Sequence, residues 1–262
     1  MAREEPTYRS ISRQELLGRA PEDRSFVGLL FPADLGLDEF DFTESRFDRC
    51  LFQVPTVRGA DFSNAEFSDC RFEPMRFANC KLAKARLRSC ALFDAGKRKA
   101  CTFAFCDLQG AELGKCNLAT ASFERCDLYN LNAVECSFRG AQFHQSTFTK
   151  AISRRSALTK ASFDKCNISF ADLSGLCLQN CEFLSCKFSE ASFIDTDLSH
   201  ATMLACDLDR IAWDRAKLHR ADLRGSNLSG LNLAVVSSYA GLRISESEQS
   251  EVLKQLGIDV SP

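Results

Sequence analysis

The sequence has few of the residue types on which enzymes rely. It contains one Trp, three Tyr, three His and three Met in 262 residues. Neither charge sign is in large excess, because the net charge is −2, and this excludes the strongly basic field of a general nucleic-acid binder. No apolar run reaches the roughly 18 residues that a membrane-spanning helix needs. The N-terminal sequence MAREEPTYRS is charged where a secretory signal peptide is apolar, so we expect a cytoplasmic protein without a membrane anchor.

Phenylalanine and cysteine are abundant instead, with 22 and 14 copies, and they follow a period. A large apolar residue recurs every five positions from Phe42 to Leu92 and again from Phe103 to Leu233. The residue two positions before it is small, most often Cys or Ala. A period of five matches neither a helix nor a strand. It is typical of a solenoid whose chain turns a corner in every repeat, with the small and the large residue inward and the other three outward.

The repeats themselves have a recognisable form. They are written CDLQG, CNLAT, CDLYN, ADLSG, CDLDR, ADLRG and SNLSG. These sequences resemble the pentapeptide-repeat family over about three quarters of the chain. The resemblance implies an all-β fold, a right-handed quadrilateral parallel β-helix with four repeats in each coil.

A four-sided coil places residues 20 positions apart directly above one another. The spacing slips between Leu92 and Phe103, and we interpret the slip as a six-residue loop at 95–100. This choice aligns one aromatic ladder of Phe77, Phe103, Phe123, Phe143, Phe163 and Phe183. After the loop the repeats are expected to continue without interruption. The second face has one irregular place, where Leu131 and Ala133 exchange sizes and Ser153 replaces a large residue beside Arg154 and Arg155, and a kink or widened coil is expected there.

The two ends of the solenoid need covers. Ser12 and Glu15 form a capping box before a short N-terminal helix, and Ser245 and Glu248 form a second box before a C-terminal helix that ends at Gly257. The predicted organisation is an N-terminal capping segment at 1–39, the β-helix at 40–235, and a C-terminal capping helix with a dimerisation tail at 236–262.

Chemistry-bearing residues give no candidate catalytic site. Thirteen cysteines fall on the small inward position and only Cys177 points outward, so the thiols are interpreted as small buried core residues. Neighbours such as Cys101 and Cys106 lie on different sides of the coil, which argues against a zinc site. His144, His200 and His219 are outward and isolated. We therefore expect no enzyme, no metal and no cofactor.

The outward residues suggest a binding surface. Grouped by face under an uninterrupted repeat, only the first face is acidic, and its regularly spaced carboxylates include Asp107, Asp127, Asp207 and Asp209. Such a row can imitate a phosphate backbone and attract a DNA-binding groove. The alternative is that Asp or Asn before the central Leu is simply the family consensus, and composition alone favours that alternative.

Two segments resemble the quinolone-resistance branch of the family, which protects type II topoisomerases. These segments are the tail GLRISESEQSEVLKQLGIDV and the loop context CALFDAGKRKACTFAFCDL. The resemblance implies DNA gyrase or topoisomerase IV as partner, without direct binding of nucleic acid. It also implies contact through loop residues Gly96, Lys97, Arg98 and Lys99, and a homodimer through Val252, Leu253, Leu256 and Ile258. The second, longer loop of that branch has no expected counterpart, because the repeats run on through Phe148, Leu158 and Phe163.

Two classes of function remain open. The first is a dimeric DNA mimic that shields a topoisomerase from quinolones or a peptide toxin. The second is a structural scaffold or a host-directed effector rod, with its partner site in the N-terminal segment.

Overall fold

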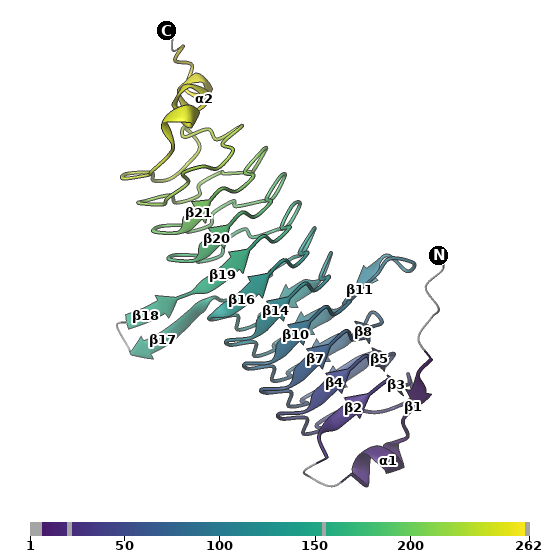
Figure 1. The fold of residues 1–262 in the computed structure, drawn as a ribbon. Helices are drawn as coiled ribbons and strands as arrows, with labels where there is room; N and C mark the ends of the chain where they lie inside the picture. Colours follow the sequence, from purple (N-terminus) through teal and green to yellow (C-terminus); the bar gives the residue numbers. More distant parts are fainter. Residues whose placement is uncertain (1–6, 20–22, 154–155, 260–262) are drawn as a thin grey trace.

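The protein is a rod of stacked coils, about ten parallel turns long (Figure 1). The computed structural model describes residues 7–19, 23–153 and 156–259. Each coil has four sides, and each side is one five-residue repeat. We number these sides as faces one to four in the order in which the chain visits them after Phe40. The predicted four-sided parallel β-helix is confirmed.

Face two is a parallel sheet of nine strands that runs almost the whole length of the rod. Its strands are β2 (Ser25–Val27), β4 (Arg46–Asp48), β7 (Glu66–Ser68), β10 (Arg86–Arg88), β14 (Glu112–Gly114), β16 (Leu131–Val134), β19 (Ala161–Asp164), β20 (Glu182–Leu184) and β21 (Thr202–Leu204).

The other faces are less regular. Face three begins with β1 (Arg9–Ser10), β3 (Leu29–Phe31), β5 (Leu51–Phe52) and β8 (Arg71–Phe72). Face four begins with β6 (Thr56–Arg58), β9 (Arg76–Ala78), β13 (Thr102–Ala104) and β15 (Ser122–Glu124). Beyond these strands, and along face one on either side of the hairpin described below, neighbouring coils are joined by single parallel bridges such as Asp107 to Asp127.

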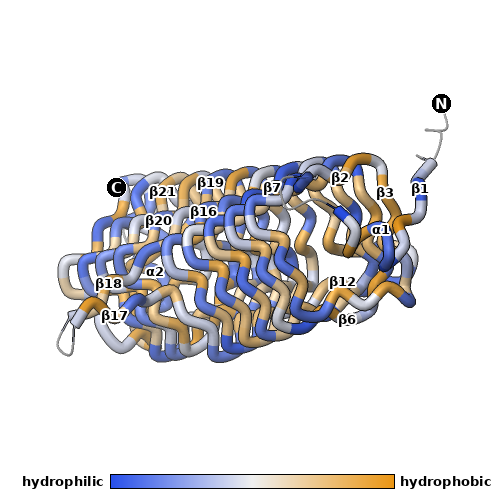
Figure 2. The backbone as a smooth tube through the Cα atoms, turned by 90° about the horizontal axis from the view of Figure 1, so that it is seen from below, coloured by the Kyte–Doolittle hydropathy of each residue, from blue (hydrophilic) through white to orange (hydrophobic). Residues whose placement is uncertain are grey.

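The core is made of the two inward residues of each repeat, and apolar and polar residues alternate along the tube in Figure 2. Equivalent rings stack from coil to coil: Phe123 lies 5.1 Å from Phe103 and 5.0 Å from Phe143 between ring centroids. Each parallel neighbour therefore covers the face of the ring before it. Thirteen cysteines are buried and Cys177 is exposed, as predicted.

Most corners place a residue in the left-handed backbone region. Asn64, Lys84, Gly110 and Asn130, for example, have φ of 57°, 57°, 66° and 59°. Asn and Gly adopt this conformation at little cost, whereas a longer side chain such as Lys is strained there. The corner N–H of one coil donates to a carbonyl of the next, as Lys84 N does to Gln109 O at 2.8 Å, and this bond stabilises the conformation.

The first interruption of the repeat is the predicted loop. Phe77 pairs with Phe103 and Leu87 with Leu113, each 26 positions apart, which confirms a six-residue insertion. The inserted residues form a small antiparallel loop between β11 (Phe93–Asp94) and β12 (Lys99–Ala100) at the corner between faces three and four. We call it the β11–β12 loop.

A second interruption contradicts the expected uninterrupted repeat. The chain leaves the coil after Phe148 and forms an antiparallel hairpin of β17 (Thr149–Ser153) and β18 (Ser156–Thr159), here called the β17–β18 hairpin. Phe163 consequently pairs with Ala133, thirty positions earlier, and not with Phe143. The predicted aromatic ladder therefore ends at Phe143, and Phe163 and Phe183 belong to face two.

The expected irregularity on face two coincides with this hairpin. The large side chain of Leu131 sits at the small position and Ala133 at the large one, and both are buried. Next to the hairpin, strands β16 and β19 are each four residues long and pair along their whole length. Ser153 lies in β17, outside the coil, and Arg154 and Arg155 fall outside the described residues.

Coil geometry begins before Phe40, because β2 and β3 already pair in register with β4 and β5. The helix α1 (Arg13–Leu17) lies at this end of the rod (Figure 1). Its predicted cap is confirmed, since the Ser12 hydroxyl accepts a hydrogen bond from Glu15 N at 3.1 Å. Leu16 is buried against the first coil.

At the other end the coil continues beyond 235, because Asp222 still pairs with Arg243. A short 3₁₀ turn, η1 (Glu246–Glu248), then leads into α2 (Gln249–Gln255), and Gly257 follows with φ of 75°. The second capping box is wrong. The Ser245 hydroxyl makes no capping bond and instead accepts one from Gly225 N at 2.7 Å, so it attaches the tail to the preceding coil.

Candidate partner-binding surfaces

The β11–β12 loop is held by hydrogen bonds of its own acidic residue. The Asp94 carboxylate accepts from the backbone N–H of Gly96 at 2.9 Å and of Lys97 at 3.1 Å. These bonds hold the pKa of Asp94 below its usual range. The Lys97 ammonium is paired with Glu73 on face three, and this bond lowers the pKa of Glu73. Of the three cations of the loop, Arg98 and Lys99 are exposed and make no ion pair with the described residues.

The β17–β18 hairpin projects further from the rod than the loop (Figure 1). Its base is closed by a hydrogen bond of 2.7 Å between the hydroxyls of Thr149 and Thr159. Ile152 and Leu158 are 56% and 52% exposed, so the hairpin presents apolar side chains to solvent. An isolated two-stranded hairpin is marginally stable in water, and exposed apolar groups on such an element indicate a contact surface. This element was missed by the sequence analysis.

The two projections lie at opposite corners of the rod. The loop leaves between faces three and four, and the hairpin leaves between faces one and two, on the other side in Figure 1. The hairpin follows two and a half coils after the loop, an axial separation of about 12 Å at the usual strand spacing. A partner that contacts both must therefore enclose the rod from two sides.

The four aspartates assigned to one acidic face lie on two different faces. Asp107 pairs with Asp127 on face one. Asp207 forms a backbone β-bridge with Lys187 on face three, and Asp209 follows in the same repeat. The prediction of a single acidic face is therefore wrong, because the ten residues of the hairpin move every later repeat on by two faces.

Face one also carries nearly as many bases as acids. Its acids are Asp41, Glu44, Asp61, Asp107, Asp127 and Asp197. Its bases are Lys81, Lys84, Lys150, Lys217 and Arg220. Several of these charges cancel locally, as in the pair of Lys81 with Asp61 at 3.1 Å. A continuous negative potential is absent from face one within the described residues.

The carboxylates have a structural role within their own repeats. Each accepts a hydrogen bond from the N–H two residues on: Asp107 from Gln109 at 2.9 Å, and Asp127 from Tyr129 at 3.0 Å. Asn117 makes the same bond to Ala119 N at 3.1 Å. Asp and Asn are thus interchangeable turn acceptors at this position, which supports the family-consensus alternative.

The environments of the aspartates differ. Burial, and secondly the neighbouring charge of Asp107, raise the pKa of Asp127. Asp207 accepts from the Ser189 hydroxyl at 2.6 Å, and this bond lowers its pKa. Asp127 is therefore the less readily ionised of the two.

The four predicted dimerisation residues, in α2 and just after it, differ in their exposure to solvent. Val252 is buried against the last coil of its own rod, so it is not available on the surface. Leu253 is half-buried. Leu256 and Ile258 are 40% and 49% exposed, and Val235 and Tyr239 also expose apolar surface at this end.

The described residues contain no cluster of three or more potential metal ligands. Burial raises the pKa of Cys101 and of Cys181 to about 12, which keeps these thiols protonated and unreactive. His200 and His219 are neighbours on face one with ring centroids 5.5 Å apart, and the His144 ring hydrogen-bonds the Gln142 amide at 3.2 Å. No helix in the described part of the chain is long and apolar enough to cross a membrane.

A four-sided rod of five-residue repeats with two surface projections defines a protein of the repeat-solenoid class. The chain belongs to the pentapeptide-repeat family. The model of pentapeptide repeats (8 copies) matches residues 58–92, 101–140 and 136–175, and that of the pentapeptide repeat region matches residues 156–233. The family is generally non-catalytic.

Solved structures of two kinds share the fold. One is QnrB1, a plasmid-mediated fluoroquinolone resistance protein. A trypsin-treated variant of QnrB1 is 22% identical, with a TM-score of 0.64, 91% of this chain covered and 99% of that chain. Full-length QnrB1 is 23% identical, with a TM-score of 0.54 and coverage of 89% and 97%.

The other kind is HetL, a pentapeptide repeat protein involved in heterocyst differentiation regulation in the cyanobacterium Nostoc sp. strain PCC 7120. It is 19% identical, with a TM-score of 0.52 and coverage of 88% and 92%. No curated protein sequence matches the chain. At these identities the structures demonstrate a shared fold.

Proposed function

We propose that this protein binds a bacterial type II DNA topoisomerase, DNA gyrase or topoisomerase IV, and protects it from quinolones or a peptide toxin. The observation that supports the proposal is the pair of projections on a rod whose fold is shared with QnrB1. The branch that the sequence resembles has two projecting loops, and this chain has two. Protection would be exerted without catalysis, by occupation of a surface of the enzyme.

The proposed contact relies on the projections more than on DNA mimicry. The acids of face one are interrupted by bases and bonded within their turns, so they offer little net attraction to a DNA-binding groove. Arg98 and Lys99 on the loop, and Ile152 and Leu158 on the hairpin, are exposed on the two projections. They would supply charged and apolar contacts on two sides of the rod.

A homodimer through the C-terminal end is part of the proposal. Leu256 and Ile258 remain exposed after α2 has covered the last coil, and a second copy of the same end would bury them. The dimer would place two rods end to end.

A structural scaffold is the second candidate. The near balance of charge on face one and the fold shared with HetL favour a rod that binds another kind of protein partner. Direct binding separates the two candidates. Purified gyrase passed over the immobilised full-length rod should bind saturably, and removal of both 95–100 and 150–159 should abolish binding. No binding by the intact rod would favour the scaffold.

A further inference from the structure

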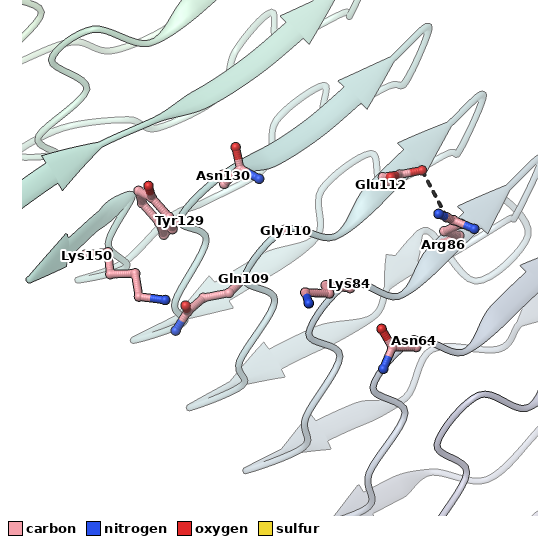
Figure 3. A pocket seen from close by; sticks show the side chains of 9 residues that line it. All are labelled: Asn64, Lys84, Arg86, Gln109, Gly110, Glu112, Tyr129, Asn130 and Lys150. Atoms are coloured by element: carbon pink, nitrogen blue, oxygen red, sulfur yellow. Dashed lines mark hydrogen bonds and ion pairs between the residues drawn. The ribbon is translucent and has the colours of Figure 1, made fainter. Parts of the chain in front are cut away.

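A groove runs along the corner between faces one and two, from the N-terminal coils to the base of the β17–β18 hairpin. Two adjoining recesses form it and share Asn64. The recess nearer the N-terminus has a volume of about 490 Å³ and is lined by Arg24, Ser25, Glu44, Arg46, Asn64 and Glu66. The recess nearer the hairpin, of about 410 Å³, contains Lys84, Gly110, Tyr129 and Lys150 (Figure 3).

Corner residues of successive coils form the floor of the groove. Gly110 opens the second recess because its neighbours in this column, Lys84 and Asn130, carry side chains and Gly110 does not. A Cβ at Gly110 would lie 3.5 Å from Lys84 Cγ and 3.8 Å from Asn130 Nδ2, so a larger side chain would fill the space between them. The amides of Asn64 and Asn130 face the same groove.

The wall on face two is electrically neutral. Glu66 Oε2 lies 3.5 Å from Arg46 Nε, and Arg86 lies between Glu66 at 3.3 Å and Glu112 at 3.2 Å. In this alternating row, the arginines and glutamates neutralise one another through ion pairs. It also presents Glu66 and Glu112 toward any ligand, which is unfavourable for the continuous negative charge of a nucleic acid.

The hairpin end of the groove is different, because its lysines are not neutralised. Neither Lys84 nor Lys150 has a carboxylate within ion-pair distance among residues 7–19, 23–153 and 156–259. The Lys150 ammonium lies 5.7 Å from the centre of the Tyr129 ring. The nearby Asp127 carboxylate is occupied by Gln109 Nε2 at 2.8 Å and Tyr129 N at 3.0 Å. Figure 3 shows Gln109 between the two lysines.

We infer that this groove binds an extended segment of a partner protein whose acidic side chains lie between Lys84 and Lys150. The lysines supply charge complementarity at one end, and the Tyr129 ring and the amides of Asn64 and Asn130 contact the peptide along its length. Between Glu44 and Lys150 the groove spans five coil steps, or about 24 Å, which corresponds to about seven residues of extended peptide. The inference goes beyond the proposed function, because it holds for any partner with such a segment.

Fluorescence anisotropy with the full-length protein tests this directly. The probe is a fluorescein-labelled seven-residue alanine peptide with two adjacent glutamates, and the matched probes carry two glutamines or are heptathymidylate. We expect binding of the glutamate probe at least tenfold tighter than that of either other probe. A Lys84→Gln, Lys150→Gln double variant should weaken it at least tenfold.

The control variant Lys165→Gln, Lys187→Gln removes the same charge elsewhere and includes another corner lysine, since Lys165 also has a left-handed φ of 52°. It should change the affinity less than twofold. Gly110→Asn, which tolerates the left-handed backbone, should fill the recess and weaken binding without unfolding the rod. Equal loss in both double variants, equal binding of the glutamine probe, tighter binding of heptathymidylate, or no binding of the glutamate probe would each overturn the inference.

Discussion

Phe163 lies beside Ala133 in the sheet of face two, although the two residues are thirty positions apart in the chain. The hairpin that separates them leaves the coil at Phe148 and returns at Lys160, whose N–H donates to Phe148 O at 3.1 Å. The columns of the core continue across this junction, so the hairpin is an addition to the rod and not a part of its wall. The same holds for the β11–β12 loop, where Cys101 N donates to Leu92 O at 2.9 Å.

Removal of the ring of Phe123 should destabilise the rod strongly. Phe123 is buried between Phe103 and Phe143, and Phe123→Ala leaves a cavity that we expect to cost about 3 to 5 kcal/mol of unfolding free energy. Urea denaturation followed by circular dichroism measures it. Phe105→Ala, at a ring that is 51% exposed, is the control and should cost much less. Similar losses in both variants would contradict the core assignment.

Trp213 should tolerate replacement by Phe unusually well. Its indole is buried and stacked on Phe193 at 5.3 Å, and its Nε1 atom has no hydrogen-bond partner within the described residues. Loss of an unsatisfied buried donor gains about 1 to 3 kcal/mol, which offsets the smaller ring. Thermal unfolding of Trp213→Phe should show a nearly unchanged midpoint. Destabilisation as large as that of Phe123→Ala would indicate an acceptor for Nε1.

Asp127 gives a prediction about pH. Burial raises its pKa, so the folded state favours the protonated carboxyl and the charge is a cost at neutral pH. That cost is absent below the ordinary aspartate pKa, where the carboxyl is protonated in both the folded and the unfolded state. It grows as the pH rises above that value and is complete once the pH exceeds the raised pKa of the folded state. Asp127→Asn should therefore be more stable than the original protein at pH 7 and equal to it at pH 3, as measured by urea denaturation at both values. A variant that is less stable at pH 7 would show that the carboxylate charge is needed.

The C-terminal apolar surface should mediate self-association. Leu256→Ser with Ile258→Ser removes the exposed side chains while Val252 keeps α2 on the core. Light scattering should show a dimer for the full-length protein and a monomer for this variant, with unchanged circular dichroism. A monomeric full-length protein would limit α2 to the role of a cap.

The period of five predicted the fold and the buried cysteines because each repeat places the same two positions inward. The β11–β12 loop could also be found, since an insertion of six residues breaks the phase at Phe103. The β17–β18 hairpin could not be found from the period, because an insertion of ten residues leaves a five-residue repeat in phase. Such an insertion changes only which residues stack above one another in successive coils.

One signal for the hairpin was present in the sequence. If the coil after Cys136 is thirty residues long instead of twenty, most of the inward cysteines fall into one continuous column. This column contains Cys50, Cys70, Cys90, Cys116, Cys136, Cys166, Cys186 and Cys206. The error in the acidic face followed from the same missed step, because it assigned Asp207 and Asp209 to the wrong side of the rod. The capping bond expected at Ser245 failed for a different reason, since a tertiary contact with Gly225 competes for the hydroxyl.

Gyrase supercoiling in the presence of ciprofloxacin tests the central proposal most directly. Four proteins are compared at matched concentration: the full-length rod, the rod without 95–100, the rod without 150–159, and the rod without both. Each deletion rejoins the chain in phase, Asp94 to Cys101 and Thr149 to Lys160, so the coils should remain intact by circular dichroism. We predict that the full-length rod restores supercoiling, that each deletion reduces the rescue and that the double deletion abolishes it. No rescue by the full-length rod, or equal rescue by the double deletion, would contradict the proposal.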